Sequence, residues 1–206
     1  MRKNRLLDRI INKKYTVLRS KKRRGILMHT PVNNKISSKA TISIGESFRF
    51  NFPWVPTFKC SLGNINLSEG AKVSIGKVVF YSGCNLSVDG TFSFQSGYVN
   101  YNSTIICRNE ISIGKNVIIA PEVIIRDSDQ HNLIDNNLHM GVRPASAPIH
   151  IGNHVWIGTR AIILKGVNIG NNVVIASGAV VTRDVPDNCC AAGVPARIIK
   201  KNINWN

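Results

Sequence analysis

Apolar residues recur every six positions along residues 151–186, which read IGNHVW, IGTRAI, ILKGVN, IGNNVV, IASGAV and VTRDVP. The first and fifth positions of each hexad hold only Ile, Val or Ala, whereas the third and fourth hold polar residues or glycine. Because six is even, the first and fifth positions face the same side of a strand, and the spacing does not fit a helix with its period of ~3.6 residues. Each hexad therefore predicts one short strand and one turn, and three hexads predict a coil of ~18 residues with a buried aliphatic interior. This pattern indicates an all-β parallel β-helix, since an ordinary β-sandwich does not require uninterrupted hexads.

The same hexads begin earlier, at Ile113, as IGKNVI, IAPEVI and IRDSDQ, and then break. Asp129 occupies a fifth position where an apolar residue is expected, and the aliphatic columns return only at Ile151. We therefore expect residues 131–150 to leave the coil as an extruded loop. Long loops between regular elements often carry function, so the sequence directs attention to Asp127–His131.

The rest of the chain divides around this coil. We expect the coil itself over 61–186, a cap over 25–60 and a C-terminal tail over 187–206. Residues 1–24 are expected to form a basic amphipathic helix, because apolar residues gather on one side of residues 4–20. That helix either packs as a cap on the first coil or lies on an anionic membrane surface.

Charge and cysteine usage narrow the setting. The formal net charge is +16, and residues 1–24 hold eleven Lys and Arg against one acid, Asp8. No aromatic run or binding module accompanies these cations, so nucleic acid is not the expected partner. Five cysteines without a CxxC pair favour a reduced, intracellular protein. With no apolar membrane span or signal peptide, the expected location is cytoplasmic, with residues 1–24 able to contact the inner face of the cell membrane.

Three motifs carry a family resemblance: VWIG at 155–158, the hexads after it, and AAGVPARIIK at 191–200. Together they resemble the hexapeptide-repeat acyltransferases, in particular the galactoside, maltose and surface-polysaccharide O-acetyltransferases. The resemblance covers about residues 100–200. It implies a left-handed coil, against the usual right-handed crossover, together with a homotrimer and acetyl-CoA as the acetyl donor.

His131 is the candidate catalytic base. Transfer from a thioester to a sugar hydroxyl needs a base that works near neutral pH, and histidine can also return the proton to the leaving thiolate. In the hexapeptide-repeat family that this sequence resembles, a histidine at the start of the loop has this role, and His131 stands at that position. Asp127 and Asp129 are candidates to orient its ring, or alternatively to accept backbone N–H groups at a turn.

Other candidate site residues follow from the same resemblance. Asn100 matches an amide that stabilises the tetrahedral oxyanion, with a turn residue as the alternative. Arg108 stands where the galactoside enzymes often have an acidic residue, which suggests an anionic sugar or a phosphate, and Asn102 is a further candidate for the acceptor. The candidate cofactor residues are Trp156, Gly158, Thr159, Ser177, Thr182, Arg183, Arg197 and Lys200.

The expected activity is O-acetylation of a sugar hydroxyl in a bacterial surface polysaccharide such as a capsule or O-antigen. The alternatives are acetylation of a xenobiotic hydroxyl and a non-enzymatic binding scaffold. A zinc site built from His139, His150 and His154 is not expected, because the spacing of these residues does not match three converging ligands.

Overall fold

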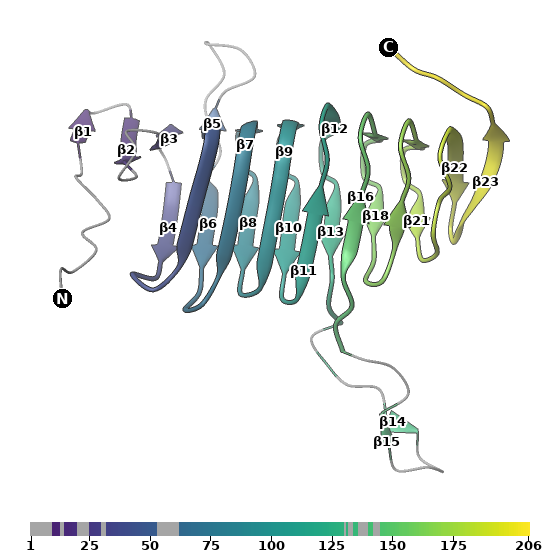
Figure 1. Ribbon diagram of the computed structural model, residues 1–206, viewed down its shortest axis with the longest axis horizontal. Coiled ribbons are helices and arrows are strands. Elements are labelled where there is room, and N and C mark those ends of the chain that lie inside the picture. Colours follow the sequence, from purple (N-terminus) through teal and green to yellow (C-terminus); the bar gives the residue numbers. More distant parts are fainter. Residues whose placement is uncertain are drawn as a thin grey trace.

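The computed structural model describes residues 10–12, 15–19, 25–29, 32–52, 62–129, 131, 134–135, 140–141 and 145–206. Within these residues every regular element is a strand, and most strands stack in parallel along one elongated coil (Figure 1). The coil has three faces, each formed by strands of successive turns. The polypeptide passes from the first face to the second, then to the third, and back to the first.

The first face is a seven-stranded parallel sheet. Its strands are β4 (Val32–Ile36), β6 (Gly63–Leu67), β8 (Asn85–Val88), β10 (Thr104–Cys107), β13 (Ile124–Arg126), β18 (Ile162–Ile163) and β21 (Val180–Val181).

The second and third faces share three long strands at the N-terminal end, β5 (Thr41–Phe52), β7 (Lys72–Tyr81) and β9 (Thr91–Val99). Their first halves continue the second face, whose other strands are β11 (Glu110–Ile113), β16 (Ile149–Ile151) and β19 (Asn168–Ile169). Their second halves continue the third face, whose other strands are β12 (Val117–Ile119), β17 (Trp156–Ile157), β20 (Val174–Ile175) and β22 (Cys189–Gly193).

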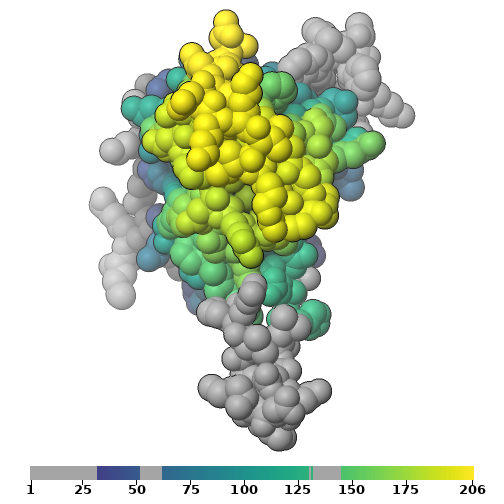
Figure 2. All heavy atoms as spheres, turned by 90° about the vertical axis from the view of Figure 1, so that its right-hand side faces the viewer, coloured from purple at the N-terminus to yellow at the C-terminus, as the bar shows by residue number. Residues whose placement is uncertain are grey.

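Strand β23 (Ala196–Lys201) pairs antiparallel with β22 at the C-terminal end. Figure 2 looks onto this end, where the yellow C-terminal residues cover the last turn of the coil. Covering the final strand in this way limits the unpaired edge that a β-solenoid would otherwise expose.

Strand pairing confirms that a segment leaves the coil. Ile163 pairs with Val181, 18 residues later, whereas Ile125 pairs with Ile163, 38 residues later. The coil between β13 and β18 therefore carries 20 additional residues. Their base is closed by two backbone bonds, from Asp129 N–H to the Ala145 carbonyl (2.8 Å) and from Ala147 N–H to the Asp127 carbonyl (2.9 Å). Beyond this base lies a short antiparallel pair, β14 (Ile134–Asp135) and β15 (Met140–Gly141).

The aliphatic columns form the core, as the hexads predict. The residues at the first and fifth positions of 151–186 are all buried, with no side chain more than 4% exposed. In the longer N-terminal turns phenylalanines fill the interior, and the Phe80 ring lies 5.5 Å from Phe48 and 5.4 Å from Phe50. Burial of each such ring contributes about 1.5–3 kcal/mol.

The helix predicted near the N-terminus is wrong where the structure describes that segment. Ile10–Asn12 (β1) and Tyr15–Arg19 (β2) are strands, followed by β3 (Gly25–His29). β3 pairs in parallel with β5, and β2 and β1 continue the sheet antiparallel. β3 pairs with the otherwise open edge of β5, and the other edge of β3 pairs with β2. These edges offer partners for the backbone N–H and C=O groups and so override the local helical pattern. No helix in the described part of the chain is long and apolar enough to cross a membrane.

Candidate active site

His131 lies just beyond the base of the extruded loop. We call the edge between the first and second faces the loop corner, because the loop departs there after β13. His131 is exposed, two residues beyond Asp129. The chain leading to it is held by the bond from Asp129 N–H to Ala145 and by the Arg126 Nε–H, which donates to the Ser128 carbonyl (2.8 Å). The histidine therefore projects from a fixed base.

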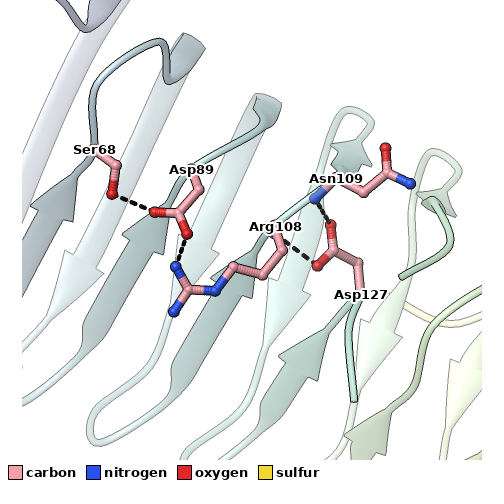
Figure 3. Close-up of polar contacts among 5 residues, drawn as sticks. All are labelled: Ser68, Asp89, Arg108, Asn109 and Asp127. Carbon is pink, nitrogen blue, oxygen red and sulfur yellow. Dashed lines mark hydrogen bonds and ion pairs between the residues drawn. The ribbon is translucent and has the colours of Figure 1, made fainter. Parts of the chain in front are cut away.

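The two aspartates near His131 have other partners. Asp127 is fully buried, and its carboxylate accepts the backbone N–H of Arg108 (2.7 Å) and of Asn109 (2.8 Å), as Figure 3 shows. This arrangement matches the turn-acceptor alternative. The Asp129 carboxylate pairs with the Lys165 ammonium group. These contacts support the two ends of the loop, and the sequence offered no signal for Lys165.

Arg108 belongs to a row of polar side chains along the loop corner (Figure 3). Its guanidinium group pairs with the carboxylate of Asp89, which also accepts a hydrogen bond from the Ser68 hydroxyl. The Arg108 side chain is 37% exposed. The Asp89 carboxylate thus partly neutralises the positive charge of Arg108, which weakens the attraction of Arg108 for an anionic acceptor.

Asn100 lies at a different edge, which we call the Gly158 corner, between the third and first faces. Here Asn100, Ala120, Gly158 and Ala176 stack, each donating its backbone N–H to a carbonyl of the next turn at 2.8–2.9 Å. The Asn100 side-chain oxygen accepts the Tyr101 N–H (2.9 Å). With the oxygen used in this way, the amide presents its NH₂ group, the polarity that a developing oxyanion needs. Asn102 follows in the left-handed region (φ 58°) and is exposed.

The candidate cofactor residues divide between three places. Gly158, Thr159 and Ser177 lie at the Gly158 corner, and Trp156 projects from β17 on the adjoining third face with 42% exposure, as its outward hexad position predicts. Thr182 and Arg183 follow β21 at the loop corner, and Arg197 and Lys200 lie on the terminal strand β23.

Gly158 has a structural reason to be glycine. A Cβ atom there would lie 2.6 Å from the Ser177 nitrogen and 2.8 Å from the Ile175 carbonyl oxygen of the next turn. Stacked turns therefore approach too closely at this corner for any side chain. This constraint operates whether or not a cofactor also approaches the same backbone.

The first face separates the catalytic candidates within one chain. Asn100 precedes β10 and the loop corner follows it, and the four residues of β10 span about 13 Å at ~3.3 Å per residue. His131 and Asn100 thus project from opposite edges of the same face. A single chain does not bring them to one reacting group.

No group of three or more His, Cys, Asp or Glu side chains is placed to hold a metal ion in the described residues. His150 instead lies 2.7 Å from the Ser112 hydroxyl through Nδ1, and His154 lies 3.1 Å from the Asn172 side-chain oxygen. His139 lies outside the described residues.

Comparison with known proteins agrees with this fold. The family model described as bacterial transferase hexapeptide (six repeats) matches residues 148–183. The galactoside O-acetyltransferase of Escherichia coli K12 is 41% identical over 124 residues, which is 60% of this chain and 58% of that protein. The putative lipopolysaccharide biosynthesis O-acetyl transferase WbbJ of the same strain is 34% identical over 151 residues, covering 68% of this chain and 72% of that protein.

A solved structure, that of the polysialic acid O-acetyltransferase OatWY, matches with a TM-score of 0.51 and 29% identity over 85% of this chain and 87% of that chain. The chain belongs to the hexapeptide-repeat transferase family, and its coil is the left-handed parallel β-helix expected from the sequence. It spans about half the length of several curated relatives that it matches.

Proposed function

We propose that this protein is an O-acetyltransferase that moves an acetyl group from acetyl-CoA to a sugar hydroxyl of a bacterial surface polysaccharide. The observation that carries the proposal is the interrupted coil. Its regular turns extrude a 20-residue loop at one point, and His131 stands exposed at the start of that loop. The names of the galactoside, lipopolysaccharide and polysialic acid relatives support the reaction and the sugar class.

In the proposed mechanism, His131 takes the proton from the acceptor hydroxyl as its oxygen attacks the thioester carbonyl carbon. The carbonyl oxygen becomes an oxyanion, and the Asn100 side-chain NH₂ donates a hydrogen bond to it. The carbon–sulfur bond then breaks, and the thiolate receives the proton from the His131 imidazolium. The products are the acetylated sugar and CoA, with no acyl-enzyme.

The same mechanism requires more than one copy of the chain. Because β10 separates the loop corner from the Gly158 corner, His131 of one copy must meet Asn100 of another. A closed ring of three copies, the trimer implied by the family resemblance, would make three such sites by repeating one contact. Some cofactor candidates lie at the Gly158 corner and others at the loop corner, which is consistent with a donor groove between neighbouring copies.

The acceptor class rests on the relatives and on charge. The net charge of +16 favours anionic partners in general, whereas Arg108 has Asp89 as a partner within the chain. Since residues 10–12 and 15–19 are strands, an amphipathic helix no longer supports attachment to a membrane. The remaining support for such attachment is the positive charge of residues 1–24.

The test is release of free CoA thiol from acetyl-CoA with a panel of sugars and surface-glycan oligosaccharides. Wild type, His131→Ala and Asn100→Ala are compared, and His150→Ala is the matched histidine control, because His150 is the middle residue of β16 on the second face. The expected result is sugar-dependent release that His131→Ala abolishes and His150→Ala retains. Undiminished CoA release by His131→Ala would exclude His131 as the catalytic base. Turnover of a drug hydroxyl but of no sugar would favour the xenobiotic reaction. Absence of both turnover and CoA binding would favour a non-enzymatic scaffold.

A further inference from the structure

The C-terminal residues turn back along the third edge of the coil (Figure 1). This edge, between the second and third faces, contains Asn116, His154, Asn172 and Asn188, all in the left-handed region with φ of 54–57°, and we call it the tail corner. Ile203 N–H donates to the Asn188 carbonyl (3.0 Å), and the Asn172 side-chain amide donates to the Ile203 carbonyl (2.8 Å). The tail is therefore attached to two successive turns.

These contacts place Trp205 over a third turn. Its ring stacks on His154 with centroids 4.2 Å apart and planes 13° apart, and its Nε1–H donates to the His154 carbonyl (3.0 Å). The ring of Trp156 lies 6.1 Å away. A half-buried indole with a stacked face and a bonded N–H is held in one orientation.

Trp205 forms one wall of a groove of about 410 Å³, which also contains Asn206. The other wall is the outer surface of the third face, with Tyr98 and Ile118, together with Asn116 of the tail corner. This volume lies in the range of small-ligand sites, about 300–1,000 Å³.

The chemistry of the groove suits a sugar ring. Its lining offers two aromatic rings and two side-chain amides, and none of its eight residues is Lys, Arg, Asp or Glu. Aromatic rings contact the C–H faces of a pyranose, and amides exchange hydrogen bonds with its hydroxyls. The phosphates of a nucleotide or of CoA would call for Arg or Lys.

We propose that this groove binds a neutral sugar ring of an oligosaccharide acceptor, next to the ring that is acetylated. The inference rests on the proposed function. Tyr98 lies near the end of β9 and Asn100 follows that strand directly, so the two residues are about 7 Å apart at ~3.3 Å per residue. A chain of sugars with its reacting ring at Asn100 therefore passes over Tyr98 to Trp205. The enzyme accordingly prefers an oligosaccharide to a single sugar.

The first test is binding without turnover. Saturation-transfer NMR is recorded with maltotetraose and with chitotetraose on wild type, Trp205→Ala, Trp205→Phe and the control Ile199→Ala, whose side chain is 64% exposed on β23 outside the groove. We expect a sugar signal in wild type and Ile199→Ala, at least a threefold loss in Trp205→Ala, and partial retention in Trp205→Phe. An equal signal in Trp205→Ala, or no signal with either sugar, would overturn the inference.

The second test uses whichever acceptor supports CoA release. Trp205→Ala should lower kcat/KM for the tetrasaccharide at least tenfold, mainly through KM, with little change for the monosaccharide and unchanged acetyl-CoA binding by calorimetry. A purely structural role of Trp205 would lower both acceptors equally, and weaker acetyl-CoA binding would assign the groove to the donor. Both results contradict the inference while leaving the proposed reaction intact, whereas loss of the proposed function would show as no CoA release by wild type.

Discussion

Replacing Asp127 distinguishes a structural role, as the acceptor of two backbone N–H groups, from a catalytic role as the partner of His131. Its buried carboxylate accepts two backbone N–H groups, from Arg108 and Asn109. Hydrogen bonds to a charged group contribute about 1.5–3 kcal/mol each. Asp127→Ala removes both hydrogen bonds. Both donors are only partly buried and can bind water instead, so we take about 1.5 kcal/mol for each bond and expect the free energy of unfolding to fall by about 3 kcal/mol.

Asp127→Asn keeps one acceptor oxygen and turns an NH₂ group toward the other donor, so we expect it to lose about half as much. For a domain of this size the Asp127→Ala loss corresponds to a fall in Tm of roughly 6–12 °C. The control is Asp184→Ala, because Asp184 accepts the backbone N–H (2.8 Å) and the side-chain amide (3.2 Å) of Asn168 at an exposed position. Asp184→Ala should lower the free energy of unfolding by less than about 1 kcal/mol, since water replaces the lost acceptor at the surface.

Urea unfolding followed by fluorescence measures these differences, and CoA release measures activity in parallel. The structural role predicts that stability falls in Asp127→Ala and that residual activity below the unfolding transition is reduced only through the loosened loop. Wild-type stability combined with abolished activity would refute this reasoning and make Asp127 a partner of His131.

Two further predictions concern the interior of the coil. Burial raises the pKa of the Cys84 and Cys107 thiols to about 12, with the charge of Asp127 adding to the effect at Cys107, so iodoacetamide at pH 8 should label both only after unfolding, as read by mass spectrometry. These thiols ionise near pH 9 in the unfolded chain, so their contribution to the free energy of unfolding is complete below pH 9 and should decrease as the pH rises toward 12. Denaturation midpoints that do not change between pH 9 and 12 would contradict this prediction. Gly158→Ala should destabilise the fold by more than Gly178→Ala. A Cβ at Gly158 would lie 2.6 Å from an atom of the next turn, whereas a Cβ at Gly178 would have no atom within 4 Å, and the φ of 71° there costs about 1–2 kcal/mol. Equal thermal midpoints of the two variants would contradict the close approach of the turns at Gly158.

The C-terminal coil could be predicted from sequence because one hexad corresponds to one strand and one turn. Each aliphatic position of 151–186 is buried where the pattern places it, and the break at Asp129 marks the loop base. The same alternation of inward and outward positions predicts that the Trp156 side chain points outward, as the structure shows. In these turns the local pattern and the global fold agree.

The N-terminal half was harder, since β5, β7 and β9 each run through two faces without the regular turn that marks a hexad. The local pattern does not predict β1 and β2 as strands, because they pair onto β3, which itself pairs with the distant edge of β5. Local patterns carry no information about such contacts. The same limit applies to Asp127, whose donors lie 18 and 19 residues earlier, and to Trp205, whose partner His154 lies 51 residues away.

His131 and Asn100 stand at two edges of one face, and subunit mixing determines whether they act from different copies. His131→Ala and Asn100→Ala, each inactive alone, are unfolded together in equal amounts and refolded. If His131 and Asn100 act from different copies, about a quarter of the sites regain both groups, since each contributing copy is the right variant in half of the cases. CoA release should then return to about a quarter of the wild-type rate. Mixed assemblies with no activity, in a preparation whose exchange of copies is verified by mass spectrometry, would contradict the account.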